Sequence, residues 1–158
     1  MFDIAEIMTR EPYTLGADCN LHDARKLMAE HHIRHVPIID AKGGLIGLVS
    51  QRDILAAEPP WASNPISGSV PSQPAVTLGS IMTTPVDTVA ETASLRGAAL
   101  HLQKNKLGCL PVITADKLVG IITDSDFVSV AINLMELLEE AEAEEGDDTL
   151  LADMDELE

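Results

Sequence analysis

Two short motifs in this chain combine residue types that could hold a sugar phosphate. The pattern G-x-x-S-x-x-D spans residues 47–53, and the pattern G-x-x-T-x-x-D spans residues 120–126. Glycine permits close approach of the backbone, amides at a helix start attract an anionic phosphate, and a carboxylate can accept two hydrogen bonds from vicinal ribose hydroxyls. A single copy also matches an ordinary helix capping box. Two copies at equivalent places indicate a binding role.

The motifs belong to a longer internal repeat. Residues 7–9 (Ile-Met-Thr) recur as residues 81–83, and residues 37–39 (Pro-Ile-Ile) recur as residues 111–113 (Pro-Val-Ile), each displaced by 74 positions. After one residue is lost from a turn, the two motifs are 73 positions apart. Each unit is too short to bury a comfortable core alone, so we expect the copies to pack against each other about a pseudo-two-fold axis. A cleft on that axis is the natural place for a ligand.

Each motif is expected at a corner where a strand runs into a helix. In the first unit, Asn20 can cap a helix whose apolar residues recur on one face. Residues 36–39 and 45–49 are predicted to form the strands of a hairpin, and a second helix is predicted over residues 51–57.

The second unit repeats this order. Ser94 is predicted to cap a helix, residues 110–113 and 118–122 to form strands, and a further helix to begin near Asp124. The local order in each unit is strand, helix, strand, strand, helix. The predicted fold class is therefore α/β (α+β), with two βαββα units packed as a pseudo-two-fold pair.

The chain is predicted to have four segments. These are a first unit (1–58), a proline-rich linker (59–79), a second unit (80–135) and an acidic C-terminal helix extension and tail (136–158). Proline removes amide donors and fixes the backbone, which is typical of a connecting segment. Past Gly146 the apolar content is too low for a fixed fold, so we expect that end to be mobile or partner-dependent.

The net charge of −16 is unevenly distributed. Residues 136–158 contain 12 of the 26 acidic residues and no basic ones, which leaves 14 acidic against 10 basic residues in positions 1–135. The repeat body is thus nearly balanced, and the tail carries the acidity. This excess of negative charge argues against binding to duplex nucleic acid, which needs a cationic protein surface.

Composition also suggests a compartment. The chain does not begin with a basic stretch followed by an apolar run, and no apolar segment approaches the roughly 18 residues of a membrane span. Cys19 and Cys109 show no metal-ligand spacing and fit reduced thiols. We therefore expect a cytoplasmic protein without a membrane span.

The repeats resemble CBS domains, named after cystathionine β-synthase, in the tandem arrangement called a Bateman module. The resemblance covers about residues 3–135 and rests on the Ile-Met-Thr starts, both glycine-to-aspartate motifs, and residues 34–40 (RHVPIID) and 108–113 (GCLPVI). It implies a disc-like pair of units with a site in each of two clefts. It also implies adenosine-containing ligands (AMP, ADP, ATP or S-adenosylmethionine), no required cofactor, and pairing of two modules into a homodimer.

By the family pattern, Asp53 and Asp126 would bind ribose, with Ser50 and Thr123 near the phosphate or ribose. The residues just ahead of each proline-containing strand would line the clefts. The resulting ligand-binding set is Thr14, Arg34, His35, Pro37, Ser50, Arg52, Asp53, Thr88, Gly108, Cys109, Pro111, Thr123 and Asp126.

The two clefts differ in charge. The first unit brings Arg34, His35 and Arg52 close to where phosphates would lie, whereas the second brings Asp124 and no cation. A phosphate beside Asp124 would meet like charge, which costs on the order of 1 kcal/mol or more in a partly desolvated cleft. We therefore expect one good nucleotide site, at the Asp53 corner. Cations could still be donated across a cleft that both units share.

Two functions of different classes follow. The leading hypothesis is a regulatory sensor of an adenine nucleotide or S-adenosylmethionine, which passes ligand occupancy to a dimer or a regulated protein partner. The alternative is an adaptor with empty clefts that docks a partner through its acidic tail. An enzyme is not expected, because no nucleophile or acid–base pair is evident, and the histidines at 31, 32 and 35 lack the paired acid of a zinc enzyme.

Overall fold

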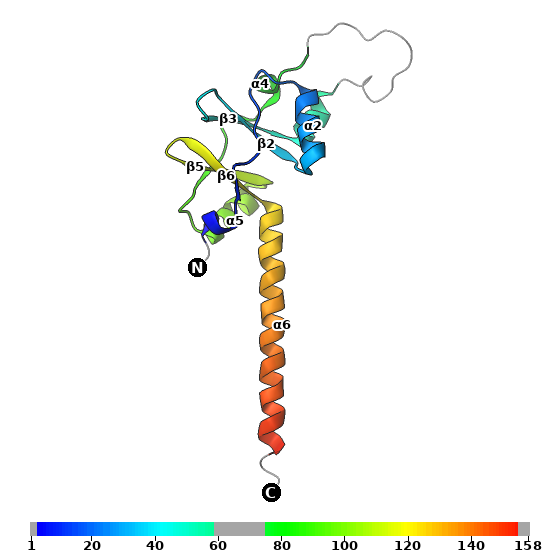
Figure 1. Cartoon of the computed structure of the whole chain (residues 1–158), viewed down its shortest axis with the longest axis vertical. Helices are drawn as coiled ribbons and strands as arrows, with labels where there is room; N and C mark the ends of the chain where they lie inside the picture. The colour runs from blue at the N-terminus through cyan, green and yellow to red at the C-terminus, as the bar shows by residue number, and fades with distance from the viewer. Residues whose placement is uncertain (1–2, 59–74, 155–158) are drawn as a thin grey trace, which may run out of the picture. The chain divides into compact units, whose positions relative to one another are not determined.

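The computed structural model describes residues 3–58 and 75–154, with side chains as far as residue 143. The chain forms two compact units, Met1–Ile122 and Thr123–Glu158 (Figure 1). Residues 59–74, most of the predicted linker, lie outside the described part. Within that part no helix is both long enough and apolar enough to cross a membrane.

The first repeat contains two short opening elements followed by the predicted helices and hairpin. Asn20 caps the first long helix as predicted: its side chain accepts a hydrogen bond from Asp23 N at 3.1 Å, and Asp23 Oδ2 accepts one from Asn20 N at 2.9 Å. The elements are α1 (Ile4–Ile7), β1 (Thr9–Arg10), α2 (Leu21–His31), β2 (His35–Ile39), β3 (Leu45–Ser50) and α3 (Gln51–Ala57).

The second repeat has a similar order, although its short strand β4 is the counterpart of the segment at Leu15 and not of β1. Ser94 caps its long helix by accepting a hydrogen bond from Gly97 N at 3.0 Å. The elements are α4 (Leu78–Ile81), β4 (Val89–Ala90), α5 (Leu95–Asn105), β5 (Cys109–Thr114) and β6 (Lys117–Thr123). The mixed α/β class and the repeated order of elements agree with the sequence prediction.

The two repeats exchange their first strands. β1 pairs antiparallel with β6, placing Thr9 opposite Ile121. In the same way, Thr83 pairs antiparallel with Leu48 of β3. The second pairing is the first one carried over by the repeat displacement, so the start of each repeat completes the sheet of the other.

A further pairing occurs within each repeat. β4 runs parallel to β5 with Val89 opposite Val112, and the segment before α2 runs parallel to β2 with Leu15 opposite Ile38. The first sheet has the strand order β1-β6-β5-β4. The β2–β3 hairpin has the equivalent neighbours, but each is a single bridge: Thr83 lies beside β3, and Leu15 lies beside β2.

The core follows this exchange. Leu78 of α4, from the second repeat, is fully buried among residues of the first. Its counterpart Ile4 of α1 is also fully buried, and the neighbouring Asp3 pairs with Ser94 of the second repeat. The core around Leu78 comprises Ala24, Met28, Val36, Ile38, Val49 and Ile54. Neither repeat therefore closes its core alone.

The second compact unit is dominated by the helix α6 (Asp124–Met154). It continues past Gly146 into the end of the chain that the sequence predicts to be mobile or partner-dependent. One glycine costs a helix only about 1 kcal/mol relative to alanine, so Gly146 need not end it. Residues 155–158 lie outside the described part.

Candidate ligand-binding site

Ser50 and Asp53 form a hydrogen-bonded corner where β3 becomes α3. Asp53 Oδ2 accepts hydrogen bonds from Ser50 N and from Ser50 Oγ, both at 2.7 Å, while Asp53 N donates to Ser50 Oγ at 3.2 Å. This is a capping box, which satisfies amides at the start of α3. A carboxylate has a second oxygen and about four lone-pair sites, so capping does not exhaust the acceptor capacity of Asp53.

The predicted cationic residues lie at the same end of the β2–β3 hairpin as this corner. His35, the first residue of β2, is the register partner of Ser50, the last residue of β3. The amide of Gln51 donates to the carbonyl oxygen of Arg34 at 2.8 Å. The hairpin register thus brings Arg34, His35, Ser50 and Asp53 to one sheet end, and Arg52 follows in the exposed first turn of α3.

The corresponding residues of the second repeat reach this place from the other side. The imidazole of His35 lies against Gly108, where an added Cβ atom would be 2.9 Å from both Cε1 and Nε2. A side chain at position 108 would therefore displace the ring. Cys109, which follows Gly108, is buried. Predicted site residues from both repeats meet at the His35–Gly108 contact.

The motif glycines have a structural role that the sequence did not reveal. A Cβ atom at Gly47 would overlap the thioether of Met82, and one at Gly120 would lie 2.5 Å from Met8 Sδ. The close approach that these glycines allow is made by a methionine of the other repeat. The glycine and the Ser50–Asp53 pair of one motif thus serve different purposes.

The second corner repeats the first within the other compact unit. Asp126 Oδ2 accepts hydrogen bonds from Thr123 N at 2.7 Å and from Thr123 Oγ1 at 3.0 Å. Thr88, Gly108, Cys109 and Pro111, the remaining predicted residues of the second repeat, belong to the unit Met1–Ile122. A cleft that joins them to Asp126 remains a prediction.

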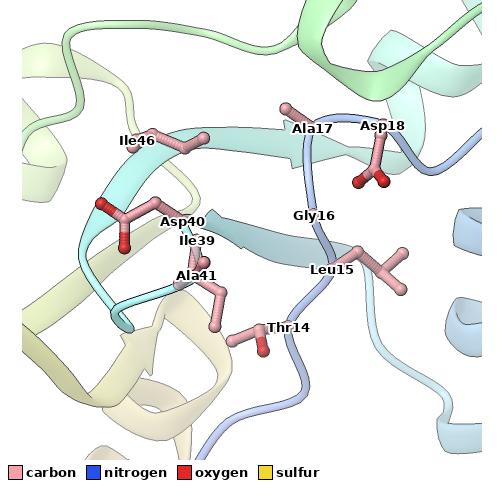
Figure 2. Close-up of a pocket in the computed structure, with 9 residues that line it drawn as sticks. All are labelled: Thr14, Leu15, Gly16, Ala17, Asp18, Ile39, Asp40, Ala41 and Ile46. Atoms are coloured by element: carbon pink, nitrogen blue, oxygen red, sulfur yellow. The ribbon is translucent and has the colours of Figure 1, made fainter.

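Thr14 lies in a pocket that sequence reasoning missed (Figure 2). The pocket has a volume of about 580 Å³ and is formed where the segment before α2 runs beside the β2–β3 hairpin. No other residue of the predicted set lines it. The lining residues are Thr14, Leu15, Gly16, Ala17, Asp18, Ile39, Asp40, Ala41 and Ile46.

Asp40 in this pocket is held in its charged form. Its Oδ1 accepts hydrogen bonds from the amides of Gly44 at 2.9 Å and Lys42 at 2.8 Å. These amides, that of Gly44 first, lower the pKa of Asp40 below its ordinary value of 3.8. The pattern Asp-x-x-Gly-Gly in a hairpin turn could have indicated this bond but not the pocket.

The proline positions and the histidine run have structural explanations. Pro37 and Pro111 are fully buried in β2 and β5. The ring of His31 stacks on Tyr13, with centroids 3.7 Å apart. Within residues 3–58 and 75–143, no three histidine, cysteine or acidic side chains gather closely enough to hold a metal ion.

Comparison with protein families identifies the class. The CBS domain family matches twice, over residues 4–59 and 78–133. The chain belongs to this family and carries a tandem CBS pair, a Bateman module.

Solved structures show the same fold. One is a Vibrio cholerae protein assigned to acetoin utilization (AcuB), which is 48% identical, with a TM-score of 0.72 over 89% of this chain and 97% of that one. The CBS domain pair of MJ0100, solved with 5′-methylthioadenosine and S-adenosylmethionine, is 26% identical, with a TM-score of 0.71 over 84% of this chain and 98% of that one. CBSX2, solved with AMP, is 28% identical, with a TM-score of 0.71 over 85% of this chain and 99% of that one.

Curated relatives include both enzymes and a protein of similar size. L-aspartate semialdehyde sulfurtransferase of Methanocaldococcus jannaschii is 27% identical over 78% of this chain, which spans 22% of that enzyme. A CBS domain-containing protein of Dictyostelium discoideum is 25% identical over 84% of this chain and 93% of that protein. The match to the enzyme thus covers a small part of its length.

Proposed function

We propose that this chain is a cytoplasmic, non-catalytic regulatory module that binds an adenosine-containing ligand: AMP, ADP, ATP or S-adenosylmethionine. The observation that carries the proposal is the corner formed by Ser50 and Asp53. It lies beside His35 of the same repeat, and His35 packs against Gly108 of the second repeat. The adenosine compounds in the structures of MJ0100 and CBSX2 support this choice of ligand class.

In the proposed complex, Asp53 accepts hydrogen bonds from the ribose hydroxyls, and Ser50 lies near the ribose or phosphate. Arg34, His35 and Arg52 supply the cationic side on which phosphates would lie. The Thr123–Asp126 corner carries Asp124 in the first turn of α6 instead. We therefore assign the charged nucleotide to the Asp53 corner, and assign to the other a weak site or a less charged adenosine ligand.

The strand exchange offers a route from binding to signal. Thr83 of the second repeat exchanges backbone hydrogen bonds with Leu48 of β3. Leu48 lies two residues before Ser50 in the same strand. A ligand held by Ser50 and Asp53 would therefore lie at the end of β3, the strand of the first repeat that pairs with Thr83 of the second. If it binds one relative arrangement of the repeats better than another, it shifts the population toward that arrangement. The readout would be the surface of a homodimer or the docking of a regulated protein.

Calorimetric titration of the full chain with AMP, ADP, ATP, S-adenosylmethionine and 5′-methylthioadenosine tests the proposal. We expect saturable binding of at least one compound and its loss in Asp53→Ala. The matched control is Asp23→Ala, which removes the same kind of capping box from α2, away from the predicted site. Absence of saturable binding at millimolar ligand, or an equal loss in both variants, would contradict the sensor function.

The same samples test the absence of catalysis. Nucleotides incubated with the protein should be recovered unchanged, because the corner offers binding groups without an evident nucleophile and base. Conversion of ATP to ADP that a single substitution at the corner abolishes would instead indicate an enzyme. Binding to a partner without any nucleotide binding would favour the adaptor function.

A further inference from the structure

The pocket at Thr14 can be compared with the same place in the second repeat. The segment before α2 runs parallel to β2 with Leu15 opposite Ile38, and β4 runs parallel to β5 with Val89 opposite Val112. Val89 and Val112 each lie 74 positions after their counterparts in the first repeat. The backbone around the pocket is therefore matched residue by residue in the second repeat.

An arginine side chain lies at the corresponding place in the second repeat. Arg10 Nη1 donates a hydrogen bond to Glu91 Oε1 at 3.1 Å, and Arg10 Nη2 donates one to the carbonyl oxygen of Ala5 at 3.2 Å. Thr114 Oγ1 donates to the second oxygen of the same carboxylate, Glu91 Oε2, at 3.2 Å. The second repeat thus holds a guanidinium ion between a carboxylate and a backbone carbonyl.

The first repeat has carboxylates at this place but not the arginine. At the displacement of 74 positions, the counterparts are Ala17 for Glu91, Asp40 for Thr114, and Thr84 for Arg10. Ala17 and Asp40 both line the pocket, and so does a second carboxylate, that of Asp18 (Figure 2). The lining contains no lysine, arginine or histidine. The pocket therefore carries two negative charges where the second repeat pairs one with its own arginine.

Both carboxylates have acceptor capacity left for a ligand. A Cβ atom at Gly16 would lie 2.7 Å from Asp18 Oδ1, so the glycine leaves room for this oxygen beside the backbone of the pocket. Within the described part of the chain, the Asp18 side chain takes part in no hydrogen bond or ion pair. The amides of Gly44 and Lys42 both donate to Asp40 Oδ1, which leaves the second oxygen of Asp40 as an acceptor.

We propose that this pocket binds a small guanidinium compound, which takes the place that Arg10 occupies in the second repeat. A guanidinium ion is planar and presents its N–H donors in a fixed fork that matches carboxylate oxygens. The apolar side chains of Leu15 and Ile46 would contact a short alkyl chain. The volume of about 580 Å³ lies within the range of about 300–1,000 Å³ that is typical of small-molecule sites. The proposal does not depend on nucleotide binding at Asp53.

Agmatine, in which a butyl chain joins a guanidinium group to an ammonium group, is a suitable probe. Nuclear magnetic resonance of the backbone amides follows its binding to the full chain without nucleotide. We expect saturable shifts at residues 14–18 and 39–46. Putrescine, which carries a second ammonium group in place of the guanidinium, should bind about tenfold more weakly. N-acetylarginine amide, which imitates an arginine in a protein, should also bind more weakly, because its amide groups lose water against the apolar lining.

Two substitutions test the parts of the proposed site. Asp18→Asn removes one of the two charges and should weaken agmatine binding by about tenfold. Thr84→Arg introduces an arginine at the counterpart of Arg10 and should abolish agmatine binding by competing for the same carboxylates. The matched control is Asp116→Asn, which makes the same charge change in the exposed turn of the β5–β6 hairpin and should leave the affinity unchanged. Thermal unfolding reports whether each variant keeps its fold.

Three results would overturn the proposal. Equal weakening by Asp18→Asn and Asp116→Asn, or equal binding of putrescine and agmatine, would mean unspecific attraction to negative charge. Shifts confined to residues outside the pocket would place the probe elsewhere. Tighter binding of N-acetylarginine amide than of agmatine would assign the pocket to an arginine of another protein. If Thr84→Arg does not fold, Asp18→Asn and its control decide alone.

Discussion

Met82 of the second repeat places its thioether sulfur against the backbone of Gly47 in the first, in the space that a side chain at position 47 would need. Met8 makes the equivalent contact with Gly120. These reciprocal contacts accompany the exchanged strand pairings of Thr83 with Leu48 and of Thr9 with Ile121. The motif glycines therefore hold the two repeats together next to the corners proposed to bind ligand.

The contact predicts that Gly47→Ala destabilises the fold. Overpacking of this kind typically costs about 1–3 kcal/mol, because the methionine must leave a low-energy arrangement. Urea unfolding of Gly47→Ala, Met82→Ala and the double variant measures it as a coupling energy. We expect Gly47→Ala to lower the free energy of unfolding less in the Met82→Ala background than in the wild-type chain. Strictly additive effects would mean that Met82 is not what excludes a side chain at position 47.

Much of the local structure could be predicted from the sequence. Asn20 and Ser94 begin the long helices where the capping pattern placed them, and α3 spans the residues 51–57 that the pattern indicated. Capping depends on bonds three residues apart, so local sequence suffices to find it.

The exchange of first strands could not be predicted in the same way. Thr83 and Leu48 are far apart in sequence, and single-bridge pairings leave no hydrophobic period to detect. The four-residue helices α1 and α4 are too short for a helical pattern. For the site, the sequence predicted the hairpin, but the register that sets His35 opposite Ser50 and the packing of His35 on Gly108 both required the structure.

The contact between His35 and Gly108 predicts a binding defect. A methyl group at position 108 would meet the imidazole and turn it away, so Gly108→Ala should weaken adenosine-ligand affinity by about tenfold. Calorimetric titration measures the affinity, and thermal unfolding reports any loss of fold. The substitution should have little further effect in a His35→Ala background, where the ring is gone. An unchanged affinity in Gly108→Ala would show that the ring orientation does not matter for binding.

Ser50 and Asp53 should contribute to stability as well as to binding. Each of these aspartates, Asp53 and Asp23, accepts a hydrogen bond from the N-cap amide of its helix, so each alanine substitution should lower the free energy of unfolding by about 1 kcal/mol in the absence of ligand. Saturating ligand should then stabilise the wild-type chain and Asp23→Ala, because ligand binds only the folded state. Asp53→Ala should gain nothing. Equal stabilisation of both variants would remove Asp53 from the binding site.

The hairpin turn predicts a pH dependence of stability. The amides of Gly44 and Lys42 stabilise charged Asp40, so its pKa is lower in the folded chain than the ordinary value of 3.8. A depressed pKa contributes stability that is complete above the unfolded value and is lost as pH falls through the native one. Asp40→Asn keeps an oxygen acceptor in the turn but cannot titrate. Urea unfolding between pH 6 and pH 3 should therefore show the wild-type advantage over Asp40→Asn shrinking below about pH 4. A difference that stays constant over this range, or one that grows as the pH falls, would mean that the charge on Asp40 does not stabilise the turn.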